Sequence, residues 1–256
     1  MPVAAIIPAR YASTRFPGKP LARQTGKYLI QHVAEQVARA RRVDRTLVAT
    51  DDERIAEAVR SFGGEAAMTR DDHPSGTDRV AEVARGLDCE IVVNVQGDEP
   101  EIEPDHIDRL IELISDGEAP MATLAAPFAP DADPTDPNCV KVVCDRAGRA
   151  LYFSRSLLPY PRDGAGVAAD PTRWLLHLGI YAYRRAFLLE LAGLAPTPLE
   201  RAERLEQLRV LEHGHRIAIG VVDAAPIGID TPADYEAFVA RWGRGAAAAA
   251  PRSGRG

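Results

Sequence analysis

The chain has 256 residues, of which 46% are hydrophobic and 27% charged, a balance typical of globular rather than disordered proteins. Its net charge of −6 argues against a general nucleic-acid-binding protein, and with no long apolar run or signal-peptide pattern we expect no membrane partner. The odd number of cysteines (Cys89, Cys139 and Cys144), without metal-type spacing, indicates structural thiols in a reducing cytoplasm.

The stretch Val3–Leu21 combines a short apolar strand, Val3–Ile7, with a constrained cationic loop. The loop carries the cations Arg10, Arg15 and Lys19, the stiffening prolines Pro8, Pro17 and Pro20, and Gly18. Because open α/β sheets bind ligands at the carboxyl ends of their strands, this pattern predicts an anion receptor, most simply for a phosphate chain. An ordinary charged surface loop is the alternative, because neither a P-loop nor a dinucleotide fingerprint is present.

Helical and extended patterns alternate after this loop. They predict helices over Tyr28–Arg41 and Glu53–Phe62, and strands over Arg45–Thr50 and Glu65–Met68. The resulting β-α-β-α-β order predicts a parallel sheet.

A second candidate ligand loop precedes the next helical stretch. Ser75 or Thr77 can cap that helix, and Arg79 lies in its first turn. The free N–H groups of a helix start suit a ligand, but an ordinary N-cap is the simpler interpretation.

The run Ile91–Val95 is typical of a central strand buried on both faces, and Gln96-Gly97-Asp98 follows it directly. A carboxylate at this position can hold Mg²⁺, which prefers oxygen ligands and shares them with substrate phosphates. The alternative is that Asp98 only occupies a turn.

In the next part of the chain the regular alternation of strands and helices ends. The sequence predicts a helix over Pro104–Asp116, a strand over Met121–Phe128, a hairpin of Val140–Cys144 with Ala150–Phe153, a long loop over Ser154–Arg173 and an interrupted strand over Trp174–Tyr183. A loop of that length suits a role in covering a substrate or partner. His177, within the last strand, is interpreted first as a core residue.

The last part predicts a helix over Leu199–His213, a strand over Ile217–Val222 and a helix over Pro232–Trp242. Glu206 and Gln207 lie beside the apolar face of the first helix, where half-buried helix polarity is the simpler explanation and ligand contact the second. Asp230 or Thr231 can cap the last helix. The low-complexity tail, 243–256, is expected to be disordered.

Taken together, the motifs resemble those of one family. They are IPARYASTRFPGKPL (6–21), ATDD (49–52), HPSGTDRVAEV (73–83), VVNVQGDEPEI (92–102), LYFSR (151–155), HLGIYAYR (177–184), LEQLRVLEHG (205–214) and GIDTPADYE (228–236). In this order they are similar to the 3-deoxy-manno-octulosonate cytidylyltransferases, or CMP-Kdo synthetases, from about Val3 to Trp242.

The resemblance implies an α/β fold of the Rossmann-like GT-A nucleotidyltransferase type, with a mostly parallel central sheet and a smaller lobe that contains the hairpin. One domain would span 1–242, with a nucleotide-binding half over about 1–128 and a half for sugar binding and dimerisation over about 129–242. The implied reaction uses CTP, Kdo and Mg²⁺, and gives CMP-Kdo and pyrophosphate for lipopolysaccharide synthesis by a cytoplasmic homodimer.

The resemblance also implies roles for individual residues. Pro8, Ala9, Arg10, Arg15 and Lys19 would surround the triphosphate, Asp98 and Asp230 would hold Mg²⁺, and Ser75, Thr77 and Arg79 would lie near cytosine and ribose. Gln96 would lie near the reacting centre. Arg155 would bind the sugar's carboxylate, and His177, Tyr181, Glu206 and Gln207 its hydroxyls, which replaces the structural interpretation of Glu206 and Gln207.

Two rival functions stay open at this point. A related cytidylyltransferase would act on 8-amino-Kdo or a sialic-acid-like sugar, and a turnover assay on a panel of sugars separates it from the Kdo enzyme. A non-catalytic nucleotide-binding module would keep the fold but lose a metal carboxylate or a phosphate cation, yet Arg10, Lys19, Asp98 and Asp230 are all present.

Overall fold

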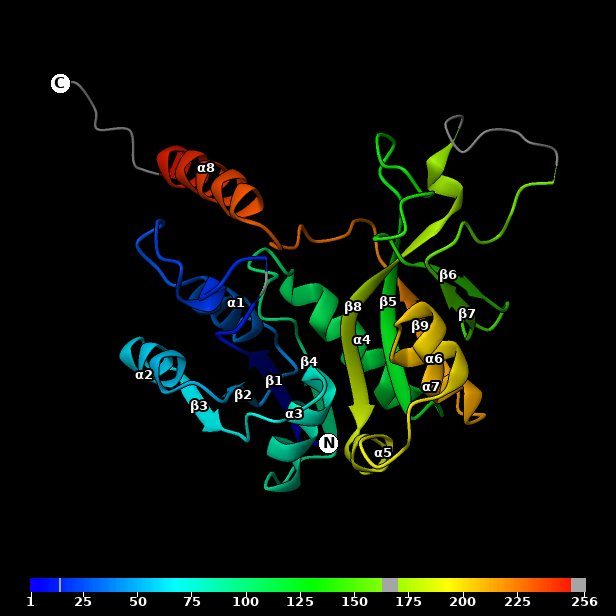
Figure 1. Ribbon diagram of the computed structural model, residues 1–256, viewed down its shortest axis with the longest axis horizontal. Helices are drawn as coiled ribbons and strands as arrows, with labels where there is room; N and C mark the ends of the chain where they lie inside the picture. The colour runs from blue at the N-terminus through cyan, green and yellow to red at the C-terminus, as the bar shows by residue number, and fades with distance from the viewer. Residues whose placement is uncertain (14, 163–169, 250–256) are drawn as a thin grey trace.

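The computed structural model describes residues 1–13, 15–162 and 170–249, and its centre is one mixed β-sheet (Figure 1). The strands are β1 (Val3–Ala9), β2 (Arg45–Thr50), β3 (Glu65–Met68), β4 (Ile91–Asn94), β5 (Met121–Pro127), β6 (Lys141–Cys144), β7 (Ala150–Ser154), β8 (Leu175–Arg184) and β9 (Ile217–Val221). The helices are α1 (Leu29–Val37), α2 (Glu53–Ser61), α3 (Gly76–Arg85), α4 (Pro104–Asp116), α5 (Arg185–Leu191), α6 (Pro198–Glu203), α7 (Gln207–Glu212) and α8 (Pro232–Ala249).

The main sheet has the strand order β3-β2-β1-β4-β8-β5-β9. Parallel pairing joins β3, β2, β1 and β4, and also joins β5 to β9. Strand β8 is antiparallel to both of its neighbours, β4 and β5, and β6 pairs with β7 and β8 at the side. The predicted α/β fold with a mostly parallel sheet is therefore confirmed, with β8 as the reversed strand.

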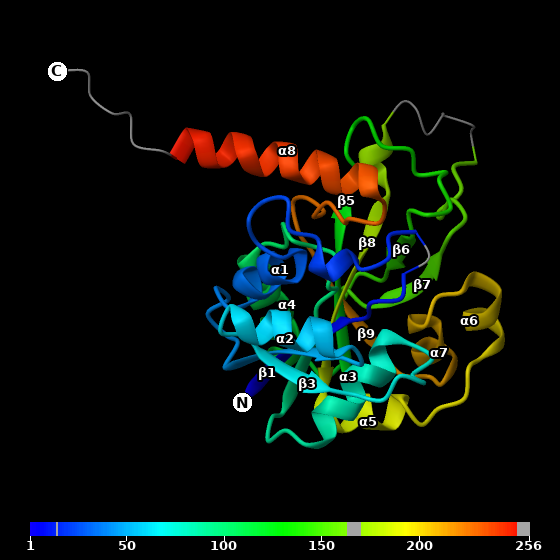
Figure 2. The same ribbon diagram turned by 60° about the vertical axis from the view of Figure 1, so that its left-hand side comes forward.

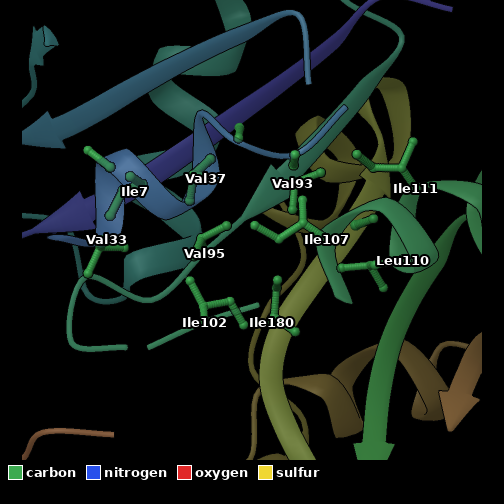
Figure 3. Packing of buried hydrophobic residues seen from close by; sticks show 14 of the residues in the cluster. Ile7, Val33, Val37, Val93, Val95, Ile102, Ile107, Leu110, Ile111 and Ile180 are labelled. Atoms are coloured by element: carbon green, nitrogen blue, oxygen red, sulfur yellow. The ribbon is translucent and has the colours of Figure 1, made fainter. Parts of the chain in front are cut away.

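Two apolar clusters cover the two faces of this sheet. Successive residues of a strand point to opposite faces, and so Ile7 of β1 joins the cluster that includes helices α1 and α4, whereas Ile6 joins the cluster that includes α3 and α5. Figure 3 shows the first cluster, with Ile7 and Val93 of the sheet facing Val33 of α1 and Ile107 of α4. Burial on both faces explains why three successive residues of β4, Ile91–Val93, are apolar.

The predicted long helix over Leu199–His213 is wrong, because the chain forms two short helices, α6 and α7. The break lies at Arg204, whose φ of 53° is left-handed and ends α6. Arginine has no sequence preference for this conformation, so apolar spacing alone suggested a continuous helix. Helix α5 was also missed.

Helix α8 is longer than predicted, since it continues past Trp242 to Ala249. Alanine is the strongest helix former, and the alanine run prolongs the helix where low complexity had suggested disorder. The expected disorder of 243–249 is therefore wrong, while 250–256 and residues 163–169 of the predicted covering loop lie outside the described residues. Figures 1 and 2 both show α8 beside α1, at the edge of the molecule. Within the described residues no helix has the length and apolarity to cross a membrane.

Candidate active site

A pocket of about 470 Å³ opens beyond the carboxyl ends of β1 and β4. Nine of the predicted site residues line it: Pro8, Ala9, Arg10, Arg15, Lys19, Arg79, Gln96, Asp98 and Asp230. The loop after the first strand and the loop after the central strand therefore line one pocket. The pocket is also lined by Ala12, Ser13, Pro20, Gly76 and Gly97, which sequence analysis did not single out as ligand contacts.

Two glycines, Gly18 and Gly97, allow close packing in the loops around this pocket. Gly18 has a φ of 69°, donates its N–H to the Tyr11 carbonyl at 3.0 Å, and packs so closely that a Cβ atom would lie 3.1 Å from the Tyr11 ring. At Gly97 a Cβ atom would lie 2.9 Å from the carbonyl oxygen of Pro8, a contact that real Cβ atoms avoid. Glycine at position 97 thus lets the loop after β4 approach the end of β1.

The side chain of Lys19 is the point where three segments of the chain meet. Its Nζ lies 2.7 Å from Oδ2 of Asp98, donates to the Ile229 carbonyl at 2.6 Å, and lies 3.8 Å from Oδ1 of Asp230. Arg15 pairs with the same Asp230 oxygen at 3.0 Å. The lysine therefore lies between the two predicted metal carboxylates.

Asp230 is available to the pocket because another residue caps helix α8. Thr231 Oγ1 accepts a bond from the Asp234 N–H at 3.2 Å, and the Asp234 carboxylate accepts one from the Thr231 N–H at 2.8 Å. This reciprocal cap decides the open question of which residue begins the helix, in favour of Thr231. The Asp230 side chain is 52% exposed.

The paired carboxylates fit a divalent cation. The Lys19 ammonium already places one positive charge between Asp98 and Asp230, which shows that both carboxylates face a common position. Among the described residues no group of three or more His, Cys, Asp or Glu side chains forms a metal cluster. Two carboxylates supplemented by substrate phosphates and water match the way in which proteins hold Mg²⁺.

Arg79 is fixed in the pocket wall by the segment that follows β2. Its side chain is buried, and the guanidinium donates to Asp51 Oδ2 at 2.9 Å and to the Thr69 hydroxyl. The ATDD motif (49–52) thus supplies the partner of Arg79, a contact that sequence analysis did not predict.

Ser75 and Thr77 lie at the start of α3, but their hydroxyl groups bind a residue from the other half of the chain. Ser75 caps the helix, and the two hydroxyls donate to the Glu206 carboxylate at 3.0 and 2.5 Å. Gly76, between them, lines the pocket. The structure therefore joins predicted nucleotide-binding residues to a predicted sugar-binding residue through direct hydrogen bonds.

The other residues predicted to bind the sugar's hydroxyl groups form a packed row on and beside β8. His177 and Tyr181 lie with ring centroids 5.5 Å apart, and the Tyr181 hydroxyl donates to Gln207 Oε1 at 3.4 Å. His177 is half-buried, but protein surrounds its ring so closely that burial lowers its pKa to about 3, and burial raises the pKa of Tyr181. Nε2 of Gln207 is buried with no hydrogen-bond partner among the described residues.

A bulge in β8 connects this row to the pocket. The pairing of β8 with β5 shifts opposite Thr123 and Leu124, next to Gly179. The Gly179 carbonyl accepts a bond from Nε2 of Gln96 at 3.0 Å, so Gln96 lies between the pocket and the row. The strand predicted to be interrupted at His177 and Gly179 is continuous: it carries a bulge next to Gly179, and His177 pairs normally with Ala125.

Arg155 lies elsewhere in the described structure. Its guanidinium donates to the backbone carbonyls of Glu203 at 2.7 Å and Pro137 at 2.9 Å, and it does not line the pocket. In this arrangement the side chain holds the end of β7 to the start of the α6–α7 turn. Its predicted contact with the sugar's carboxylate stays a prediction.

Glu99 is a polar residue near the site that sequence analysis did not select. Its Oε2 atom is buried without a hydrogen-bond partner among the described residues, and burial, followed by the neighbouring Asp98 charge, raises the pKa of Glu99 to about 8. In the sequence, its position next to Asp98 was the one feature that could have identified Glu99 as a site residue.

Comparisons with known proteins identify the family of this chain. The family described as cytidylyltransferase matches residues 4–217. A 3-deoxy-manno-octulosonate cytidylyltransferase of Geobacter metallireducens is 54% identical over 251 residues, covering 95% of this chain and 99% of the relative. The corresponding protein of Syntrophotalea carbinolica is 52% identical over 239 residues, covering 91% and 96%.

Solved structures give the same result for the fold. A CMP:2-keto-3-deoxy-manno-octonic acid synthetase complexed with CTP superposes with a TM-score of 0.90 at 43% identity, covering 96% of this chain and 100% of that one. A 4-diphosphocytidyl-2C-methyl-D-erythritol synthase from Anaerococcus prevotii has a TM-score of 0.61 at 14% identity, covering 95% and 99%. The second likeness concerns the fold alone.

Proposed function

The chain belongs to the 3-deoxy-manno-octulosonate cytidylyltransferase family, and we propose that it transfers CMP from CTP to the 2-hydroxyl of Kdo with release of pyrophosphate. The observation that carries this proposal is the convergence of Lys19, Asp98 and Asp230 in one pocket at the carboxyl ends of β1 and β4. A phosphate chain and a divalent cation need this combination of cations and carboxylates.

In the proposed reaction the sugar hydroxyl attacks the α-phosphorus of CTP, a new P–O bond forms, and the bond to the pyrophosphate breaks. Arg10, Arg15 and Lys19 bind the triphosphate and neutralise charge as it moves to the leaving group. Such a transfer depends on positioning and charge rather than on a covalent intermediate, so the site needs no nucleophile of its own.

Asp98 and Asp230 are the residues that would hold Mg²⁺. When bound, the ion supplies charge neutralisation at the phosphates and lowers the pKa of the attacking hydroxyl. Lys19 helps to keep the two carboxylates together, because its ammonium is within 2.7 Å of one and 3.8 Å of the other.

Gln96 would orient the sugar beside the α-phosphate, since its amide is held by Gly179 at the border between the pocket and the row on β8. His177, Tyr181, Glu206 and Gln207 would bind hydroxyl groups of the sugar. The unpaired Nε2 of Gln207 supports this assignment, because a buried donor without a partner is costly unless a ligand accepts its hydrogen bond. To bind the sugar's carboxylate, the Arg155 guanidinium would have to give up its hydrogen bonds to the backbone carbonyls of Glu203 and Pro137.

On the other side of the pocket, Ser75, Thr77 and Arg79 would lie near the cytosine and ribose, and Pro8 and Ala9 beside the triphosphate. We extend the proposal to the setting that the family resemblance implies: a cytoplasmic homodimer whose product is used for lipopolysaccharide synthesis. Size-exclusion chromatography with light scattering tests the dimer directly.

Pyrophosphate release tests the proposed reaction. The purified protein is given CTP, Mg²⁺ and one sugar of a panel: Kdo, 8-amino-Kdo or a sialic acid. We expect the highest kcat/KM with Kdo. Turnover with another sugar but not with Kdo would contradict the substrate, and CTP binding without turnover of any sugar would favour the non-catalytic module.

A further inference from the structure

The two proposed metal carboxylates belong to segments that are far apart in the sequence. Asp98 follows β4, and Asp230 lies just before Thr231, the residue that caps α8. Their separation in space therefore depends on how α8 is attached to the loop that carries Asp98. Any contact that fixes this helix relative to that loop also fixes the distance between the carboxylates.

One attachment lies at the beginning of α8. The N–H of Ile229 donates to the Asp98 carbonyl at 2.9 Å, and Ile229 is fully buried in a small apolar cluster with Leu29, Tyr235 and Phe238. Beside it, the Tyr235 hydroxyl accepts a bond from the Gln24 N–H at 2.8 Å. These contacts anchor the first turns of the helix.

A second attachment lies further along the same helix. Nε of Arg241 lies 3.3 and 3.2 Å from the two carboxylate oxygens of Glu101, and its terminal nitrogen lies 2.6 Å from one of them. The side chains are only 29% and 35% exposed. Glu101 lies in the same loop as Asp98, so this forked ion pair joins α8 to that loop at a second point.

The rings of Phe238 and Trp242 hold α8 to His32 of α1, with centroids 5.1 and 4.5 Å apart. The Arg241–Glu101 ion pair instead ties this part of α8 to the loop that carries Asp98. We propose that Arg241 is a positioning residue for the metal: by holding Glu101 it keeps α8 at the angle that places Asp230 opposite Asp98. This inference rests on the proposed function, in which those carboxylates hold Mg²⁺.

A merely structural ion pair would behave differently. Partly exposed ion pairs contribute little to stability, so Arg241→Gln should unfold at nearly the wild-type temperature. Residues hydrogen-bonded directly to metal ligands affect metal affinity about 10–100-fold. Arg241 acts on the carboxylates through Glu101 and the backbone, so we expect its effect on metal binding at the lower end of that range. The two roles therefore predict different results in one variant.

Calorimetry of CTP binding without sugar separates them, because no turnover occurs. CTP affinity is measured in EDTA and in Mg²⁺, and the ratio of the two dissociation constants gives the contribution of the metal. We expect Arg241→Gln and Glu101→Gln each to reduce this ratio about tenfold, with CTP affinity in EDTA unchanged. The charge-swapped pair, Glu101→Arg with Arg241→Glu, should restore part of the loss.

Arg42→Gln is the matched control, since Arg42 forks onto Glu112 at 3.2 and 2.8 Å without joining the two carboxylate segments. An equal effect of Arg42→Gln and Arg241→Gln, or a loss of CTP affinity in EDTA, would overturn the inference. If Arg241→Gln fails to fold, the charge-swapped protein alone decides by keeping or losing the ratio. Asp98→Asn separates a failure of this inference from a failure of the proposed metal site. If Asp98→Asn keeps the wild-type ratio of dissociation constants, the assignment of Asp98 as a metal ligand is wrong.

Discussion

The two sides of the proposed site differ in how their polar groups are satisfied. On the nucleotide side, Arg10 is exposed and the partners of Lys19 are carboxylates that themselves border the pocket. On the sugar side, Glu206 is bound by Ser75 and Thr77, and Tyr181 by Gln207. The phosphate-binding loops of the nucleotide side are thus preformed for an anion. Glu206 and Tyr181, and the Ser75 and Thr77 hydroxyls bonded to Glu206, must instead exchange internal hydrogen bonds to contact a ligand.

The largest expected effect comes from removing a charge on the preformed side. Asp98→Asn keeps the shape of the side chain but loses a metal ligand, so we expect kcat to fall about a thousandfold, in line with several kcal/mol of charge stabilisation from a bound metal. Steady-state kinetics give the result, and circular dichroism should show a folded protein. Wild-type turnover in this variant would remove Asp98 from the mechanism.

A smaller but still large effect is expected from adding a methyl group between the loop after β4 and the end of β1. In Gly97→Ala the new methyl group would lie 2.9 Å from the Pro8 carbonyl, so backbone must move, at a cost of about 1–3 kcal/mol. We expect weaker CTP binding by calorimetry and a lower unfolding temperature. Gly228→Ala is the control, because its Cβ would meet no atom within 4 Å. Equal behaviour of the two variants would contradict the close-approach argument.

The third prediction concerns the hydrogen bonds that connect the two sides. Thr77→Val removes the 2.5 Å bond to Glu206 and leaves a half-buried carboxylate with one fewer donor, which should cost about 1.5–3 kcal/mol of unfolding free energy. Urea denaturation of Thr77→Val, Glu206→Gln and the double variant gives the coupling energy. Additive effects would mean that this contact does not connect the two sides.

The smallest effect near neutral pH is a pH dependence of stability from the sugar side. Burial lowers the pKa of folded His177 to about 3, below its ordinary 6.5, so the unfolded chain binds the extra proton first. Stability should be complete above pH 6.5 and fall on acidification towards pH 3, by up to about 1.4 kcal/mol per pH unit. His177→Gln should flatten this slope in urea titrations between pH 7 and 5. An unchanged slope would show that His177 is not the responsible group.

Features that depend on local sequence or on a general property of the fold could be predicted from the sequence. The strands β2 and β3 and helix α4 followed from apolar periodicity. The rule that ligands bind at the carboxyl ends of parallel strands singled out Lys19 and Asp98 separately, and the resemblance placed them in one site. The resemblance added Asp230, whose own pattern had suggested only a helix cap.

The contacts that could not be predicted depend on tertiary structure. Nothing near Glu206 indicates that its partners are the hydroxyls of Ser75 and Thr77, and nothing near Arg155 indicates that backbone carbonyls hold its guanidinium. The left-handed turn at Arg204 likewise follows no residue preference. Where the partners of a polar group come from distant segments, its type and spacing do not identify them.

The reversed strand β8 has a consequence for protein engineering. It is encoded in the second half of the chain but lies between β4 and β5, which are encoded in the first half. Exchanging second halves between homologous enzymes would therefore replace a strand in the interior of the sheet along with the sugar side. A chimera intended to change acceptor preference should exchange only the α6–α7 segment, Pro198–Glu212, and leave every strand with its own neighbours.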